Sequence, residues 1–252
     1  MVKGLDVFRK YFRDFTDRYI LIGGTACDLA MQEAGIPFRA TKDLDIVLCV
    51  EALDGKFVDA FWAFVKAGKY QIQQKSSGRK QFYRFQKPQD ETYPFMLELF
   101  SRKPDALALA DESQLTPIPV DEDVSSLSAI LLNDDYYRFI HEGKKMATDL
   151  PVVGTDRLIP LKARAWIDLT ERKKRGENID SKDIKKHKND VFRLYRIIDP
   201  VLNITLPEII KKDMRSFIEL ITLEGVELKA LGLGDTKLEK VLADLKRIYG
   251  LG

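Results

Sequence analysis

Cysteine and histidine are scarce in this 252-residue chain, and each scarcity argues against a class of site. The two cysteines, Cys27 and Cys49, stand in apolar segments without C-x-x-C spacing, and no signal-peptide pattern is present. We therefore expect buried, reduced thiols in a cytoplasmic protein. His141 and His187 are the only histidines, which argues against a multi-histidine zinc site or a histidine-based nucleophilic triad.

Long apolar runs, a large excess of one charge and two common nucleotide-binding fingerprints are also missing. No run of eighteen apolar residues occurs, so we expect no membrane span. The formal net charge is only +2, so any basic patch must be local. Neither the Walker G-K-[ST] ending nor G-x-G-x-x-G occurs, which argues against a P-loop and a dinucleotide site. The composition, 45% hydrophobic and 32% charged, is that of an ordinary globular protein.

The periodicity of the apolar residues changes near residue 154. Before it, helices are predicted at 5–19, 24–35, 56–68 and 134–146, and strands at 19–23, 43–51, 70–76, 80–86, 94–102 and 126–132. After it, only helices are predicted, at 155–176, 180–198, 205–225 and 236–250. The sequence thus predicts an α/β (α+β) domain over 1–153 and a helical domain over 154–252.

Two aspartates interrupt the apolar strand "DLDIVL". Asp43 and Asp45 are two residues apart, so in a strand their side chains project to the same side. Two neighbouring carboxylates repel unless solvent or a cation intervenes, and Mg²⁺ prefers hard oxygen ligands. The alternative is that both acids lie at the exposed mouth of the strand and bind nothing.

A third acid, Glu98, is the one charged residue of the apolar segment "PFMLELF". A glutamate in such a strand is unusual unless it is paired or binds a metal. If its strand lies near that of Asp43 and Asp45, the three carboxylates could hold two metal ions. The alternative is a glutamate at the end of the strand, in a salt bridge with a lysine.

A glycine pair, Gly23 and Gly24, separates a predicted strand from a predicted helix, with Thr25 at the start of the helix. Backbone amides at such a helix start can bind an anion, and small residues let a phosphate approach closely. Alone, a Gly-Gly turn before a helix is weak support for a phosphate site.

Taken together, "IGGTA" followed by "TKDLDIVL" resembles the nucleotidyltransferase superfamily, which has a glycine turn, a D-x-D strand and a later acid. The spacing is most similar to the AbiEii-type branch, which includes toxins of type IV toxin–antitoxin systems. The resemblance implies a mixed β-sheet flanked by helices, then a helical half that completes the nucleotide and acceptor site. It extends to "LPVVGTDRLIPLKARAWIDL", with Lys162, and to "SKDIKKHKNDVFRL", with Asp183 and Asp190.

The resemblance also implies residue roles. Asp43, Asp45 and Glu98 would hold Mg²⁺, in a two-metal site, with Glu98 helping to deprotonate the attacking hydroxyl. Lys162 would neutralise phosphate charge, and Asp190 or Asp183 would orient Lys162 or the acceptor. The nucleotide-contacting residues would be Gly23, Gly24, Thr25, Thr41 and Lys42. The alternative for Lys162 is a solvated lysine on a helix surface.

The function implied is Mg²⁺-dependent transfer of a nucleoside monophosphate from a nucleoside triphosphate to an acceptor hydroxyl. As in the toxin branch, the acceptor would be an RNA 3′ end, such as tRNA, or a protein hydroxyl, and a cognate antitoxin is an expected partner. The alternatives are transfer to a small molecule, as in antibiotic-modifying relatives, a non-catalytic nucleotide-binding protein and an interaction module. The basic stretch 172–188 could hold an RNA backbone, although a solvated helix surface is the favoured interpretation.

Overall fold

The computed structural model describes residues 2–49, 54–72, 84–102, 115–117 and 128–252. The chain divides into two compact units, residues 1–153 and 154–252. The first is a mixed sheet flanked by helices and the second is helical, so the predicted fold class is confirmed. The predicted strand segments 50–51, 73–76, 80–83 and 126–127 lie outside the described residues. Among the described residues, we find no helix that combines the length and the apolarity needed to cross a membrane.

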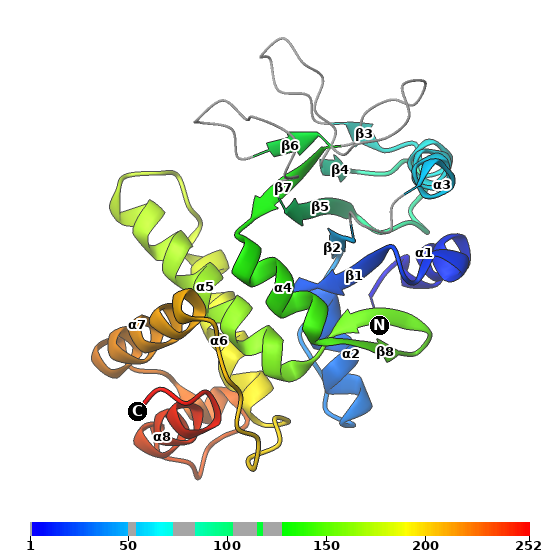
Figure 1. Cartoon of the computed structure of the whole chain (residues 1–252). Coiled ribbons are helices and arrows are strands. Elements are labelled where there is room, and N and C mark those ends of the chain that lie inside the picture. Colours follow the sequence, from blue (N-terminus) through cyan, green and yellow to red (C-terminus); the bar gives the residue numbers. More distant parts are fainter. Residues whose placement is uncertain (1, 50–53, 73–83, 103–114, 118–127) are drawn as a thin grey trace. The chain divides into compact units, whose positions relative to one another are not determined.

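The first unit is built on one mixed sheet (Figure 1). Its described strands are β1 (Tyr19–Ile22), β2 (Asp43–Leu48), β3 (Gln71–Ile72), β4 (Arg84–Gln86), β5 (Met96–Arg102), β6 (Leu115–Pro117), β7 (Ser128–Leu132), β8 (Lys144–Ala147) and β9 (Leu150–Val153). They lie in the order β3-β4-β5-β2-β1-β9-β8, with β7 also paired to β5 and β6 paired to β7. The pairs β2–β5, β1–β9 and β5–β7 are parallel, so strands distant in sequence meet at the centre of the sheet.

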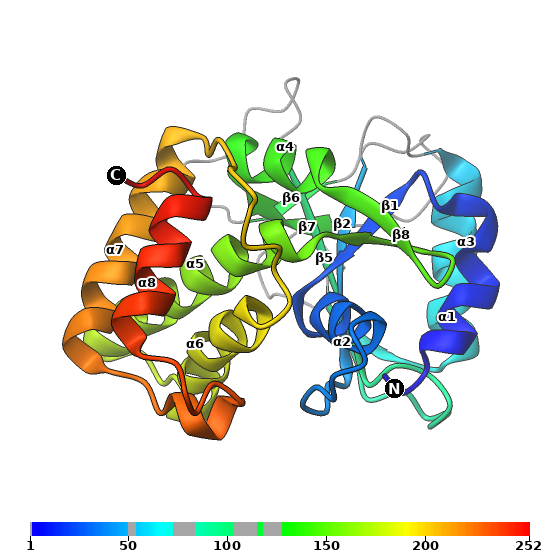
Figure 2. The ribbon, with the colours of Figure 1, turned by 90° about the horizontal axis from the view of Figure 1, so that it is seen from below.

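Aromatic packing covers one face of this sheet. Helices α1 (Leu5–Phe12) and α3 (Gly55–Ala67) lie side by side there (Figure 2). Phe8 and Phe12 of α1 stack with ring centroids 4.4 Å apart, and both contact Tyr19 of β1. The apolar side chains of β1 and β2 that share the face of Tyr19 are therefore buried. The predicted first helix ends earlier than residue 19, because a short 3-10 turn, Arg13–Phe15, follows α1.

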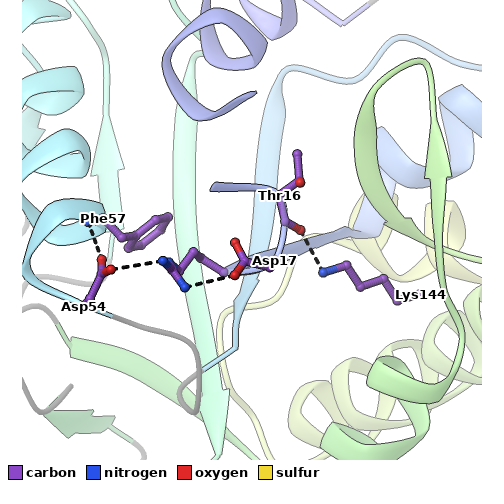
Figure 3. A network of polar contacts seen from close by, with 6 residues as sticks. Thr16, Asp17, Asp54, Phe57 and Lys144 are labelled. Atoms are coloured by element: carbon purple, nitrogen blue, oxygen red, sulfur yellow. Dashed lines mark hydrogen bonds and ion pairs between the residues drawn. The ribbon is translucent and has the colours of Figure 1, made fainter. Parts of the chain in front are cut away.

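The turn before β1 is held by a polar network (Figure 3). Arg18 pairs with Asp17 at 2.9 Å and with Asp54 at 3.0 Å. Asp54 also caps α3 by accepting a hydrogen bond from the Phe57 amide at 3.0 Å. Lys144 Nζ donates to the Thr16 carbonyl at 2.7 Å, which joins β8 to the same turn. These contacts hold the first residues of β1 in place relative to α3 and β8.

One predicted helix is wrong at its end. Helix α4 (Asp134–Glu142) stops at Gly143, and residues 144–147 form β8, which pairs with β9 in an antiparallel hairpin. Thr148 and Asp149 make the connection with φ of 50° and 64°. The sequence pattern missed this hairpin because its turn contains no glycine, the residue that usually supplies positive φ.

The second unit contains the four predicted helices. They are α5 (Thr155–Lys174), α6 (Ser181–Tyr195), α7 (Glu208–Glu224) and α8 (Leu238–Ile248), with a short 3-10 turn at Leu228–Leu231 (Figure 1). Trp166 of α5 contacts Phe217 of α7 edge to face, with centroids 5.4 Å apart. Asp180 caps α6 by accepting a hydrogen bond from the Lys182 amide at 2.8 Å. The aromatic contact joins α5 to α7 in a core that the buried apolar side chains of all four helices share.

Helix α5 contains a proline, Pro160, which cannot donate the hydrogen bond that the Asp156 carbonyl would receive in a regular helix. The structure supplies another donor. The hydroxyl of Tyr249, a fully buried residue just after α8, donates to this carbonyl at 2.9 Å. Burial raises the pKa of Tyr249 well above its usual value, so the hydroxyl remains a protonated donor. Tyr249 thus compensates for Pro160.

We expect Tyr249→Phe to lower the free energy of unfolding by about 1–3 kcal/mol, because the hydrogen bond from a fully buried side chain to the Asp156 carbonyl is lost. Urea unfolding followed by circular dichroism measures this change. Tyr195→Phe is the matched control. Its hydroxyl donates to the partly exposed Asp244 at 2.6 Å, where water can substitute, so a smaller loss is expected. Equal losses in the two variants would contradict the compensating role of Tyr249.

Candidate functional site

The glycine pair lies where predicted, with β1 ending at Ile22 and α2 (Gly23–Glu33) beginning at Gly23. Both glycines are closely approached by side chains from the β2 side. A Cβ on Gly23 would lie 1.7 Å from Asp45 Oδ2, and a Cβ on Gly24 would lie 2.5 Å from Thr41 Oγ1. Gly23 also has a φ of 67°, which disfavours other residues. The glycines therefore bring the start of α2 against the Asp45 carboxylate.

The other predicted nucleotide-contacting residues are placed differently. Thr25 is fully buried, and its hydroxyl donates to the Asp43 carbonyl at 2.8 Å. It therefore fixes the start of β2 against α2, a structural task that differs from the predicted contact with phosphate. Lys42 is exposed, and its carbonyl accepts a hydrogen bond from the Phe95 amide at 3.0 Å. Thr41 is half-buried against Gly24.

The three predicted acids lie on one face of the sheet. Asp43 and Asp45 are half-buried and alternate with the buried Leu44 and Ile46. Strand β5 runs parallel to β2, and its register sets Glu98 directly opposite Asp45. Because paired residues on neighbouring strands project to the same side, Asp43, Asp45 and Glu98 share the face opposite the aromatic cluster. The sequence-based expectation that a neighbouring strand carries Glu98 beside the aspartates agrees with this register.

An arginine that the sequence analysis overlooked holds Glu98. Arg84 of β4 lies opposite Glu98 on its other side, and Arg84 Nε donates to Glu98 Oε1 at 2.7 Å. A second guanidinium nitrogen, Nη2, contacts the same oxygen. The predicted three-carboxylate cluster is therefore not assembled: in the part of the chain that the structure describes, no three His, Cys, Asp or Glu residues stand close enough to hold a metal ion. Glu98 does form a salt bridge, as the alternative expected, but it lies inside β5 and its partner is an arginine.

Asp43 and Asp45 fit a divalent cation better than Glu98 does as it stands. Both supply hard carboxylate oxygens from one strand face, and the Asp45 carboxylate lies against a helix start whose amides have no helical partner. The space that a side chain at position 23 would occupy is filled by the Asp45 carboxylate. A phosphate and a cation bound at this turn would compensate each other's charge. Glu98 could offer both of its carboxylate oxygens to the same cation only by exchanging its contact with Arg84 at Oε1.

This close approach gives a direct test at Gly23. We expect Gly23→Ala to lower the free energy of unfolding by at least about 2 kcal/mol, because the added Cβ meets both a strained φ and the Asp45 carboxylate. Gly35→Ala is the matched control, since Gly35 has a φ of 70° and no atom within 4 Å of an added Cβ. Chemical unfolding of both variants isolates the contact. Equal losses would show that the approach of Asp45 contributes nothing.

A second set of predicted residues meets inside the helical unit. Lys162 of α5 is 3% exposed, and its Nζ lies 3.3 Å from Oδ2 of the fully buried Asp190 on α6. Arg193 Nη1, one turn along α6, donates to Asp190 Oδ1 at 3.1 Å. Asp183 instead is exposed and pairs with Lys186 at 3.0 Å. The structure therefore places Asp190 and not Asp183 beside Lys162, and the solvated-lysine alternative is wrong.

Arg84 and Arg193 were both missed by the sequence analysis. A signal for Arg193 existed, because residues three apart on a helix are neighbours and Arg193 follows Asp190 by three. Arg84 had no local signal, since its contact with Glu98 depends on which strands pair and in what register.

Four of the eight lysines and arginines in the basic stretch 172–188 form ion pairs with acids of the helical unit. Arg172 and Arg175 both donate to Glu177, at 2.7 and 3.1 Å. The hydrogen bond from Arg172 is the main cause that lowers the pKa of the Glu177 carboxyl. Lys186 pairs with an acid one turn earlier on α6. The side chains of these pairs are partly exposed, as expected for a solvated helix surface.

Comparisons with known proteins give limited likeness. No family model and no curated protein matches the chain. JHP933 from Helicobacter pylori is similar at a TM-score of 0.41 and 15% identity, over 98% of this chain and 89% of that one. The antibiotic-resistance factor ANT(2'')-Ia is similar at 0.37 and 14%, over 87% and 94%. A second H. pylori structure, provisionally described as a nucleotidyltransferase, gives 0.41 and 14%, over 98% and 92%. Likeness of this size does not establish a family.

Proposed function

We propose that this chain is a Mg²⁺-dependent nucleotidyltransferase that moves a nucleoside monophosphate from a nucleoside triphosphate to an acceptor hydroxyl. The observation that carries the proposal is the contact between the glycine turn and Asp45. It sets a phosphate-binding helix start against one of two carboxylates that project from the same strand face. Transfer of a nucleotidyl group from a triphosphate needs both an anion site and a cation site in one place.

Each of these residues then has a role in the transfer. The acceptor oxygen bonds to the α-phosphorus, the bond from that phosphorus to the bridging oxygen breaks, and pyrophosphate leaves. The amides that follow Gly23 hold phosphate oxygens, and Asp43 and Asp45 would hold Mg²⁺. When bound, Mg²⁺ neutralises charge on the triphosphate and on the leaving group. Glu98 accepts the proton of the acceptor hydroxyl.

The helical unit contributes Lys162 in this proposal. Lys162 supplies a positive charge toward the triphosphate, and Asp190 orients its ammonium group. The contact of 3.3 Å between them supports the orienting role. The domain assignment, with residues 1–153 as the nucleotidyltransferase domain and residues 154–252 completing the site, is part of the same proposal.

For the acceptor we propose an RNA 3′ end, such as that of tRNA, or a protein hydroxyl, with a cognate antitoxin as the partner that restrains the activity. This follows from the sequence resemblance to the AbiEii-type branch. The ion pairs within residues 172–188 offset only part of the positive charge there, which leaves this stretch available to an RNA backbone.

The decisive experiment incubates the full chain with each of four α-labelled nucleoside triphosphates, with and without Mg²⁺. Total RNA and total protein serve as separate acceptor pools. We expect label in one pool, with one or more nucleotides, only when Mg²⁺ is present. Label in neither pool, together with no rise of the melting temperature on adding Mg²⁺ and nucleotide, would overturn the proposed function.

A further inference from the structure

Three charged residues from three strands form a row across one face of the sheet. Arg84 on β4, Glu98 on β5 and Asp45 on β2 are consecutive partners in the two ladders. The Glu98 side chain is 13% exposed and that of Arg84 is 35% exposed. The Arg84 Nε and Nη2 groups converge on one Glu98 oxygen, Oε1. The row thus places Glu98 between a guanidinium and another carboxylate.

This order has an electrostatic reason. Neighbouring strands are about 4.8 Å apart, so two carboxylates directly opposite each other destabilise a sheet unless a positive charge offsets them. A poorly exposed carboxylate without a partner is more costly still. The guanidinium of Arg84 supplies that charge from the side away from Asp45. A divalent cation bound between Asp45 and Glu98 would supply the same compensation with twice the charge.

We propose that Arg84 is a built-in counter-ion that occupies Glu98 until a divalent cation and a nucleotide arrive. The inference rests on the proposed function, because it assumes that Asp43 and Asp45 bind the cation. Arg84 occupies Oε1 and offsets the charge of Glu98, so a metal gains both oxygens and the full charge of this carboxylate only when Arg84 leaves. Arg84 is exposed enough to move, and its planar set of N–H donors matches a phosphate as well as a carboxylate.

A consequence is that nucleotide and metal promote each other's binding. A triphosphate bound at the glycine turn offers Arg84 a new anionic partner, which releases Glu98 to the metal. By linkage, the metal must then strengthen nucleotide binding by the same factor. Arg84 is in this view a positioning residue, which controls when Glu98 becomes available.

The test measures Mn²⁺ binding to the full chain without nucleotide, by electron paramagnetic resonance titration of free Mn²⁺. We expect Arg84→Gln to bind Mn²⁺ at least about tenfold more tightly than the parent, because the hydrogen bonds to Glu98 no longer have to break. Arg84→Lys, which keeps the charge but loses the two-nitrogen contact, should lie between them. Arg9→Gln is the matched control, since Arg9 pairs with Asp6 at 2.9 Å with a 28% exposed side chain, and should leave the affinity unchanged.

A double variant separates competition at Glu98 from a general loss of positive charge. In a Glu98→Gln background, the gain from Arg84→Gln should shrink to less than about twofold, since no carboxylate remains to be released. If the parent and Arg84→Gln bind Mn²⁺ equally well, and Asp45→Asn does not bind it, the counter-ion role is overturned. The proposed function then still stands. No Mn²⁺ binding by any variant, Arg84→Gln included, would overturn the counter-ion role, and the label-transfer assay then tests the proposed function separately.

Discussion

Asp45→Asn is expected to reduce the initial rate of nucleotidyl transfer by at least about a thousandfold, the equivalent of the several kcal/mol that a bound metal contributes. The substitution keeps the shape that fits against Gly23 and removes only the negative charge. Label transfer at saturating nucleotide and Mg²⁺ measures the rate.

The matched control for this prediction is Asp17→Asn. Asp17 is an aspartate of the same unit, 65% exposed, and it pairs with Arg18 at 2.9 Å (Figure 3). The Asp17→Asn protein should transfer label at the same rate as the parent. Mg²⁺ and nucleotide together should raise the melting temperature of the parent and of Asp17→Asn, but not that of Asp45→Asn. An Asp45→Asn protein that transfers label at the parent's rate would remove Asp45 from the metal site.

Asp190→Ala is expected to lower the free energy of unfolding by about 3–5 kcal/mol, because it strands the buried ammonium of Lys162 without its carboxylate. Asp190 is also the partner of Arg193, so two positive charges lose one acceptor. Urea unfolding, with the midpoint and slope both fitted, measures the loss.

Two further variants show whether burial is the cause. Asp183→Ala, on the same helix, removes an exposed carboxylate paired with Lys186 and should cost no more than about 0.5 kcal/mol. The apolar pair Lys162→Met with Asp190→Leu should recover most of the stability lost in Asp190→Ala, since no charge then remains buried in that pair. A similar loss in Asp190→Ala and Asp183→Ala would contradict a buried ion pair.

Local patterns explain why part of this site was predictable from the sequence. The strand, turn and helix around the glycine pair, and the shared face of Asp43 and Asp45, follow from periodicities of 3.6 and 2 residues within single elements. The pairing of Lys162 with Asp190 was proposed as one of two options, and only the packing of α5 on α6 distinguishes Asp190 from Asp183.

What the sequence did not predict depends on contacts between elements far apart in the chain. The burial of Lys162 is set by helix packing, and a single helix pattern cannot reveal it. The Arg84–Glu98 pair depends on the antiparallel register of β4 against β5. The β8–β9 hairpin replaces the end of a predicted helix, because ladder hydrogen bonds outweigh the local helical preference of residues 144–146.

The alternation of β5 also limits how the chain can change in length. Leu97 faces the aromatic side, where its partner Phe85 contacts Phe61 of α3, and Glu98 faces the acids. Inserting one residue before Glu98 within β5 would turn its carboxylate into the aromatic cluster. Inserting two residues would keep Glu98 on its present face but shift it by two positions relative to Asp45 and Arg84. An insertion of an odd number of residues would therefore bury Glu98 among aromatic side chains, and an insertion of an even number would move Glu98 away from Asp45 and Arg84. The phenylalanines on the far side of the sheet thereby determine which face Glu98 occupies.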